Sequence, residues 1–179
     1  MLLKGENLSL GPLRKDDLDV LASWYEDVDF LRFYDYHAAV PKTRGQLEKI
    51  YENAGNDGFL AFAVRKNEDG NMMGLVEIDG ISNSNGFAWV SIGFGAKTER
   101  GRGFGFEAMS LAIEFAFSEL NLDRLQLNVI SYNTAGIRLY EKLGFVREGV
   151  YREAVLRDGV RHDLYLYGLL RREWKNGNS

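Results

Sequence analysis

The N-terminal part of the chain carries an extended segment followed by an amphipathic one. Three leucines flank Pro12 over residues 8–13, which predicts an edge strand, because proline cannot donate a hydrogen bond to a sheet ladder. Apolar residues then recur every three or four positions up to about Glu26, which predicts a helix with Asp16 or Asp17 as its N-cap. An aromatic and acidic stretch, residues 30–36, lies between this helix and the next and is assigned to no element.

The next segment begins with a helix signal and continues as a hairpin. Residues 43–46 have capping-box form, which marks the start of a second helix. This helix is expected to carry Leu47, Ile50, Tyr51 and Ala54. Residues 59–64 and 73–78 then have the character of two strands, and the turn signal at 67–71 between them predicts a hairpin.

Strands and helices alternate in the second half of the chain. The pattern predicts a strand over 87–95, a helix from 103 to about 120 and a strand over 125–129. A further helix over 135–143 is ended by Gly144, at the usual left-handed cap position.

Two strands close the chain and decide the predicted fold class. They cover about 145–155 and 164–169, and the Asp-Gly pair within 157–159 marks the turn between them. Antiparallel strands thus come first, and a strand–helix–strand–helix–strand unit follows. This order predicts an α/β (α+β) fold with a mixed sheet, not a doubly wound parallel one. A length of 179 residues fits a single domain over 1–179.

Composition excludes several functional classes. The chain has no cysteine, so disulfides, thiolate metal ligation and a cysteine nucleophile are excluded, and with two histidines no metal site is expected. A net charge of −4 is opposite to the bias of a nucleic-acid binder. No apolar run is long enough for a membrane span or a signal peptide, so we expect a cytoplasmic protein without a membrane partner.

A cluster of glycines lies where a strand leads into a helix. Five of the 20 glycines fall in the run from Gly93 to Gly105. Glycines let backbone N–H groups approach a ligand closely, and a helix N-terminus carries partial positive charge, so the run suits a phosphate or pyrophosphate. It matches neither a P-loop nor a dinucleotide-binding fingerprint. The alternative is that these glycines only form a tight turn and allow close helix packing.

A second run, from Asn133 to Phe145, follows about 30 residues after the first. The pattern Arg100-x-x-Gly103-x-Gly105 resembles the pyrophosphate-binding signature of the GNAT superfamily of acyl-CoA-dependent N-acetyltransferases, and the second run resembles its partner motif. The likeness covers almost the whole chain and is nearest to the ribosomal-protein N-terminal acetyltransferases and the bacterial spermidine/spermine N-acetyltransferases. It implies a mostly antiparallel sheet flanked by helices, with a splayed strand pair that holds acetyl-CoA as co-substrate.

The resemblance also assigns the residues that bind acetyl-CoA. The backbone of Gly93, Phe94 and Gly95 would pair with the pantetheine arm. The pyrophosphate would be held by the loop amides of Arg100, Gly101, Arg102, Gly103, Phe104, Gly105 and Phe106. Asn133 matches a position whose side-chain amide contacts the cofactor. A helix N-cap is the alternative for Asn133, and one side chain can serve both purposes.

Tyr140 matches the tyrosine that donates a proton to the departing CoA thiolate in many relatives. A phenol of pKa ~10 can protonate a thiolate of pKa ~8–9 when the two are hydrogen-bonded. The alternative is a core tyrosine. Because the chain has no cysteine, we expect direct attack of the amine on acetyl-CoA, with the oxyanion met by the N–H of Phe94 or Gly95.

For the binding and activation of the amine, the resemblance points to Glu77, which matches a glutamate of the polyamine-acetylating relatives. We expect it to act as a base or as an amine-binding carboxylate, with an exposed strand position as the alternative. Trp24, Tyr34 and Asp35 are expected to line or border the acceptor pocket, although aromatic packing beneath two helices accounts for them equally well.

The sequence departs from both related groups in the acceptor region. Asn128 stands where the ribosomal-protein group often has a glutamate, and Gly80 replaces a further glutamate of the polyamine group. The expected function is acetyl transfer to a primary amine of a small molecule such as a polyamine. The alternatives are the N-terminus of a protein as acceptor, or a CoA-binding module without catalysis. A homo-oligomer, dimeric or larger, is compatible with the resemblance.

Overall fold

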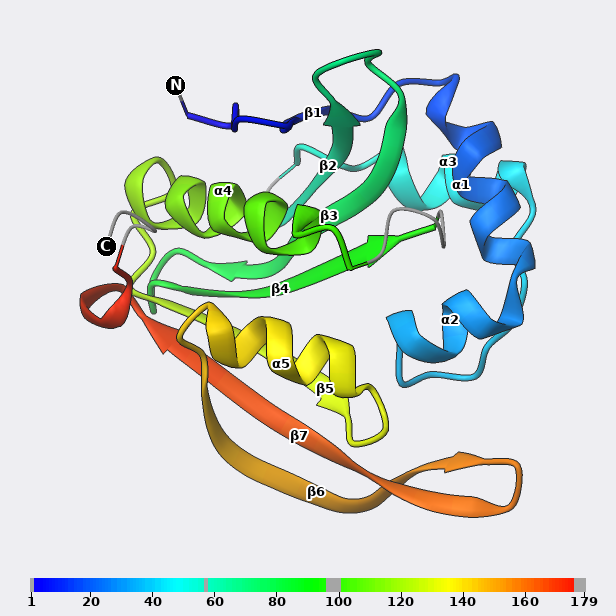
Figure 1. The fold of residues 1–179 in the computed structure, drawn as a ribbon, viewed down its shortest axis with the longest axis vertical. Helices are drawn as coiled ribbons and strands as arrows, with labels where there is room; N and C mark the ends of the chain where they lie inside the picture. The colour runs from blue at the N-terminus through cyan, green and yellow to red at the C-terminus, as the bar shows by residue number, and fades with distance from the viewer. Residues whose placement is uncertain (1, 57, 96–100, 176–179) are drawn as a thin grey trace.

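The computed structural model describes residues 2–56, 58–95 and 101–175 (Figure 1). The elements in chain order are β1 (Leu8–Pro12), α1 (Asp17–Glu26), α2 (Val28–Tyr34), α3 (Arg44–Tyr51), β2 (Phe59–Lys66), β3 (Met72–Ser82), β4 (Phe87–Phe94), α4 (Phe104–Ser118), β5 (Arg124–Ile130), α5 (Thr134–Lys142), β6 (Val146–Arg157), β7 (Val160–Leu170) and the 3-10 helix η2 (Arg171–Glu173). No helix within these ranges combines the length and the apolar character that a membrane crossing needs.

The strands form one seven-stranded sheet in the order β1-β2-β3-β4-β5-β7-β6. Paired strands of this sheet are antiparallel with the exception of β4 and β5, which run parallel because the chain returns through α4. β1 lies at one edge of the sheet, a position that tolerates Pro12, which has no N–H to donate to a neighbouring strand. The predicted fold class, a mixed and mostly antiparallel sheet flanked by helices, is confirmed.

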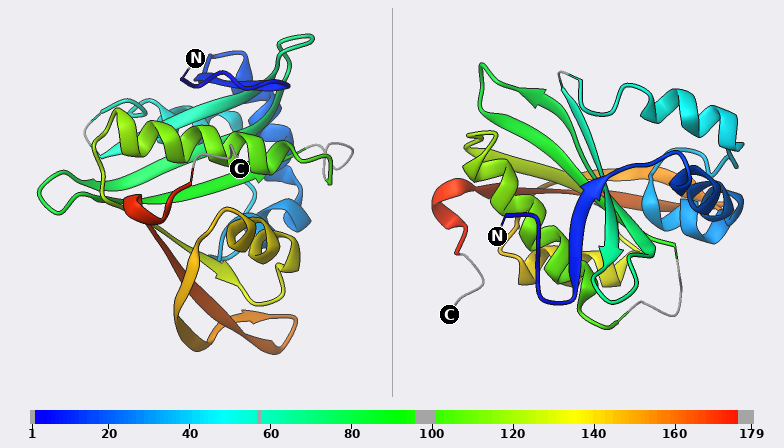
Figure 2. Two further views of the ribbon diagram at one scale, coloured as in Figure 1. Left: turned by 60° about the vertical axis from the view of Figure 1, so that its left-hand side comes forward. Right: turned by 90° about the horizontal axis from the view of Figure 1, so that it is seen from above.

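Helices cover both faces of the sheet (Figure 2), and β3 shows how the sequence divides between them. Val76 and Ile78 belong to the core cluster that includes α4, whereas Leu75 belongs to the cluster formed with α1, α2 and α3. Successive side chains of a strand point to opposite faces. Glu77 and Asp79 therefore lie on the face that α1–α3 cover.

Three local signals of the sequence have the expected structure. Thr43 forms a capping box with Gln46: its N–H donates to Gln46 Oε1 at 2.9 Å, and its hydroxyl accepts from the Gln46 N–H at 3.3 Å. Gly144 ends α5 with a φ of 94°. Asp158 and Gly159 turn the β6–β7 hairpin with φ of 50° and 78°, as a two-residue hairpin turn with two positive φ angles requires.

Three features of the first helices differ from what the sequence predicts. The stretch at residues 30–36, for which no element was predicted, contains most of α2, whose seven residues are too few to show a helical period. The Asp27 side chain caps this helix by accepting from the N–H groups of Asp29 and Phe30. α3 ends at Tyr51, so Ala54 lies beyond the helix that was expected to carry it. Asp16 occupies the N-cap of the first helix, as expected, but its side chain makes no capping hydrogen bond, and the Asp17 carboxylate is bound to Arg65.

The parallel pair β4 and β5 separates soon after it forms. Its register runs only from Phe87 opposite Arg124 to Trp89 opposite Gln126, although β4 continues to Phe94 and β5 to Ile130. β4 stays paired with β3 as far as Phe94. The far half of β4 therefore has one edge with no strand beside it, and the sheet is open at this point.

Candidate active site

A cavity of about 1260 Å³ lies where β4 and β5 separate. Its walls come from α2 and the residues after it, from β3, β4 and β5, and from α5 and the start of α4. Residues of β6 and β7 complete the lining of the cavity. The lining has two parts of different chemistry: glycines and cations from the start of α4 and from α5, which we call the glycine end, and carboxylates and aromatic rings from β3 and from the end of α2 and the residues after it, which we call the opposite end.

The glycine end lies at the start of α4. Gly101 and Gly103 line the cavity with φ of 77° and 85°, and the space around both is open. The first intrahelical hydrogen bond runs from the Phe106 N–H to the Gly103 carbonyl, so the preceding N–H groups of the helix are available to a ligand. Arg100, part of the predicted signature, lies outside the described residues.

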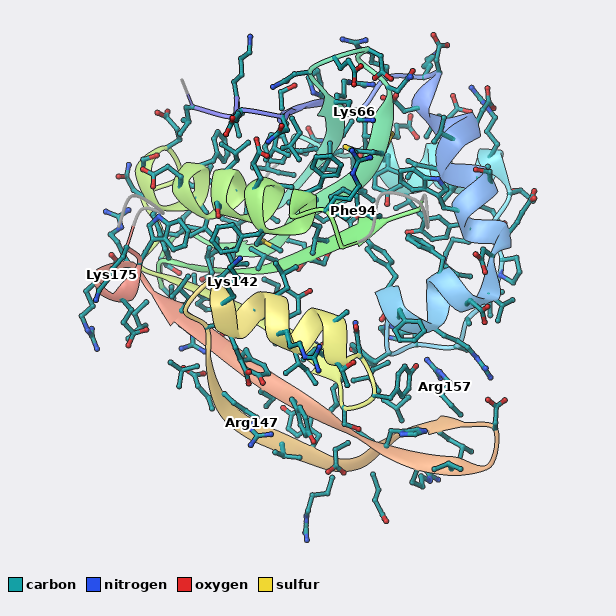
Figure 3. All side chains as sticks on the ribbon, viewed as in Figure 1. Lys66, Phe94, Lys142, Arg147, Arg157 and Lys175 are labelled. Carbon is teal, nitrogen blue, oxygen red and sulfur yellow. The ribbon has the colours of Figure 1, made fainter. Side chains whose placement is uncertain are left out.

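Cations of α5 stand beside this end. Arg138 and Lys142 both line the cavity from positions one helical turn apart, and the Lys142 Nζ lies 4.6 Å above the Phe106 ring (Figure 3). The Arg102 guanidinium covers the Phe104 ring at 5.2 Å. Phe104 itself is buried in the core, so only its backbone can serve the site. Helix N-terminus and cations together favour an anionic ligand.

Glycines of β4 let two helices approach the strand closely. The Tyr34 ring lies 2.7 Å from the position that a Cβ on Gly93 would occupy, and the Trp24 indole fills the corresponding space at Gly95. These glycines thus serve helix packing, one of the two alternatives that the sequence left open. Trp24 is buried and is not among the residues that line the cavity.

Tyr140 lines the middle of the cavity from α5. The side chain is buried and packs edge-on against Phe145, with ring centroids 6.0 Å apart. Burial raises the pKa of Tyr140 to about 12, because the phenolate would lose its hydration. Within the described part of the chain its hydroxyl has no hydrogen-bond partner, which leaves it free to donate to a ligand.

Asn133 caps α5 and ties it to α2. Its Oδ1 accepts from the Gly136 N–H at 3.0 Å, and its Nδ2 donates to the Phe33 carbonyl at 3.3 Å. The residue also lines the cavity. The N-cap interpretation is therefore confirmed, and the position allows a contact with a ligand as well.

Glu77 is held at the opposite end by hydroxyl groups. The Tyr34 hydroxyl donates to Glu77 Oε2 at 2.5 Å, and the Ser91 hydroxyl donates to the same oxygen at 3.3 Å. Burial raises the pKa of Glu77, and the bonds from Tyr34 and Ser91 partly oppose this rise. Burial also holds the pKa of Tyr34 well above 10, so the tyrosine stays a donor. The exposed strand position considered for Glu77 is thus not what the structure contains.

Two further carboxylates and a histidine complete this end. Asp79 follows Glu77 on the same face of β3, and burial, followed by the charge of Asp35, raises its pKa. His37 Nδ1 lies 2.9 Å from Asp35 Oδ1, and both line the cavity. Asp79 and His37 were not predicted as site residues from the sequence. The period-two spacing from Glu77 could have identified Asp79, whereas nothing local distinguishes His37.

The structure thus brings together most of the predicted site. Gly93, Phe94, Gly101, Gly103, Gly105, Phe106, Asn133 and Tyr140 line the cavity with Tyr34, Asp35 and Glu77. Gly95 and Trp24 lie behind the end of β4, packed on each other. Asn128, noted as a departure from one related group, also faces the cavity.

The chain is similar to one protein family and to several individual proteins. Residues 7–146 match the model of the acetyltransferase (GNAT) domain family. The SPbeta prophage-derived uncharacterized N-acetyltransferase YokL of Bacillus subtilis is 31% identical over 172 residues, which cover 96% of this chain and 94% of YokL. The spermidine N(1)-acetyltransferase of Vibrio cholerae is 29% identical over 131 residues, 73% of this chain and 75% of that enzyme. The crystal structure of a V. cholerae spermidine N-acetyltransferase in complex with CoA and spermine superposes with a TM-score of 0.86 at 25% identity, covering 94% of this chain and 98% of the other.

Proposed function

The chain belongs to the GNAT acetyltransferase family, and from that premise we propose that it transfers the acetyl group of acetyl-CoA directly to a primary amine of a small molecule such as a polyamine. One observation carries the proposal: a single cavity is lined by Arg138 and Lys142 of α5, which packs with α4 on one face of the sheet, and by Glu77 and Asp79 on the opposite face of β3, together with Asp35. CoA carries phosphates, and an aliphatic amine is cationic in water. Each end therefore suits one of the two substrates.

The glycine end supports the placement of CoA. The open space at Gly101 and Gly103 lets phosphate oxygens reach the amides that begin α4. The edge of β4 that β5 leaves, up to Phe94, offers backbone groups to the pantetheine arm. Acetyl-CoA supplies an activated thioester as the acetyl donor. Asn133 would add its side-chain amide from the start of α5.

Tyr140 is the acid in this proposal. Its hydroxyl would donate a proton to the sulfur as the thiolate departs, and a pKa raised to about 12 keeps the hydroxyl protonated at neutral pH. The burial that raises the pKa of the phenol also raises the pKa of a thiol beside it. Proton transfer between the two groups is therefore better matched than their pKa values in water suggest.

Glu77 is the base or the amine-binding carboxylate. A primary amine arrives mostly as ammonium, with a pKa near ~10.4 for a lysine-like group, and must lose a proton before it attacks a carbonyl. The carboxylate is fixed by Tyr34 at 2.5 Å, and burial raises its pKa, so it accepts a proton more readily than an exposed glutamate. Asp35 and Asp79 would hold further positive charge on the acceptor.

A thiol-release assay with acetyl-CoA tests the proposal against a panel of polyamines, amino acids, aminoglycosides and N-terminal peptides. We expect turnover with at least one di- or polyamine. Preference for N-terminal peptides would overturn the small-molecule acceptor in favour of a protein N-terminus. No turnover with any acceptor, together with tight CoA binding, would favour a binding module without catalysis.

The same assay tests the acid. Tyr140→Phe should lower kcat by about 10²–10⁴-fold, the range for removal of a positioned acid, while the dissociation constant of CoA stays within about twofold. Tyr165→Phe, on β7 and outside the cavity, is the matched control and should behave like the parent. An unchanged kcat in Tyr140→Phe would remove this residue from the mechanism.

A further inference from the structure

The acceptor end of the cavity has one wall without regular structure. Residues 35–43 connect α2 to α3 and belong to no helix or strand. The first three, Asp35, Tyr36 and His37, line the cavity. Backbone carbonyls in such a connection have no ladder partners, and their orientation depends on what else binds them.

A residue about 120 positions later binds these carbonyls. The Arg157 Nη2 donates to the carbonyl oxygens of Asp35 at 3.4 Å, Tyr36 at 3.2 Å and His37 at 2.8 Å. Arg157 is the last residue of β6, and its side chain lies between the β6–β7 hairpin and α2 (Figure 3). One guanidinium nitrogen thus faces three consecutive carbonyls, and this contact fixes the backbone conformation of residues 35–37.

The neighbouring residue of the hairpin binds α2 itself. The Arg32 guanidinium forms a two-pronged ion pair with Asp158, with Nη1–Oδ2 at 3.0 Å and Nη2–Oδ1 at 2.7 Å. Asp158 reaches this position because it occupies the turn with a φ of 50°. Arg32, Arg157 and Asp158 together form what we call the hairpin clamp.

We propose that Arg157 is a positioning residue for the acceptor, which sets the wall Asp35–His37 through the hairpin clamp. The proposal rests on the proposed function, since it assumes that the acceptor binds at this end. Arg157 is not one of the residues that line the cavity, so it acts through the wall and not on the substrate. Loss of its donors frees three carbonyls and lets the Asp35 carboxylate and the His37 ring leave their positions.

The test compares Arg157→Met, which keeps the apolar stem, with Arg157→Lys, which keeps a charge and N–H donors. Spermidine, or the panel amine that is turned over fastest, serves as acceptor at saturating acetyl-CoA. In Arg157→Met we expect the KM for the amine to rise about tenfold, the scale of one charge-assisted hydrogen bond, with kcat and the KM for acetyl-CoA within about twofold. Arg157→Lys should recover part of the loss.

Arg161→Met is the matched control, because Arg161 lies on the same hairpin and, among the described residues, its Nη1 donates to the Glu153 carbonyl of that hairpin alone. It should leave all three constants unchanged. An unchanged amine KM in Arg157→Met would overturn the proposal. So would a parallel loss of acetyl-CoA affinity and thermal stability, since that result indicates a general structural role.

Hydrogen exchange separates this inference from the proposed function. In the CoA-bound protein, the peptide that spans residues 35–43 should exchange faster in Arg157→Met than in the parent and in Arg161→Met. If no acceptor is turned over, the proposed function fails, and the proposal for the acceptor fails with it even where exchange is faster. If exchange in 35–43 is unchanged, the clamp is wrong whatever the activity.

Discussion

The hydroxyl of Tyr34 donates to Glu77 at 2.5 Å and stabilises the charged form of this half-buried carboxylate. In Tyr34→Phe that donor is lost, so the pKa of Glu77 rises further. A base must be deprotonated, and the acid limb of the kcat/KM profile should therefore move to higher pH. We expect kcat/KM near about pH 6 to fall about tenfold, since a hydrogen bond to a charge contributes ~1.5–3 kcal/mol, with a smaller loss at alkaline pH.

Tyr25→Phe provides the control for this change. The Tyr25 hydroxyl lies 3.4 Å from that of Tyr51 in the same aromatic cluster and does not bind Glu77 directly. The acid limb of Tyr25→Phe should move less than that of Tyr34→Phe, because the Tyr25 hydroxyl influences Glu77 through Tyr51 and Tyr34. If Tyr34→Phe lowers activity equally at all pH values, Tyr34 supports packing only, and Glu77 is not the base.

At the scale of elements, the glycine after β4 determines how α1 packs against the sheet. A Cβ at Gly95 would occupy space that the Trp24 indole fills, so Gly95→Ala must displace the indole or the strand end. Overpacking of this kind costs about 1–3 kcal/mol. We expect urea denaturation to show a loss of that size in the free energy of unfolding, together with weaker binding of CoA.

Gly45→Ala is the matched control, and we expect it to change the free energy of unfolding in the opposite direction. Gly45 lies in the first turn of α3, and a Cβ there meets nothing within 4 Å. Alanine favours a helix over glycine by up to ~1 kcal/mol, so this variant should be slightly more stable than the parent. Equal stability of Gly95→Ala and the parent would show that the strand end adapts without strain.

The elements also show how far the sequence could be interpreted. The order of strands and helices, the glycine turn into α4 and the cap at Gly144 follow from local patterns, and the structure contains them. α2 was missed because its seven residues give no period, and only the Asp27 cap marks it. The contact of Arg157 with the wall after α2 joins positions about 120 residues apart, so no local pattern could indicate it. It depends on the order of strands in the sheet.

Across the whole molecule, a net charge of −4 conceals a division of charge along the cavity. Lys142 lies at the end proposed for phosphates and Asp79 at the end proposed for the amine. Lys142→Gln should raise the dissociation constant of CoA about threefold and leave the KM of the amine unchanged. Asp79→Asn should raise the KM of the amine about threefold and leave the dissociation constant of CoA unchanged. Exposed charge contacts of this kind contribute ~0.2–1 kcal/mol each. Calorimetry with CoA and steady-state kinetics with the amine measure the two effects separately. Both effects should shrink between low and about 0.5 M salt, because screening shortens the reach of each charge to a few ångströms. If the two variants weaken both ligands equally, the cavity does not divide its substrates by charge.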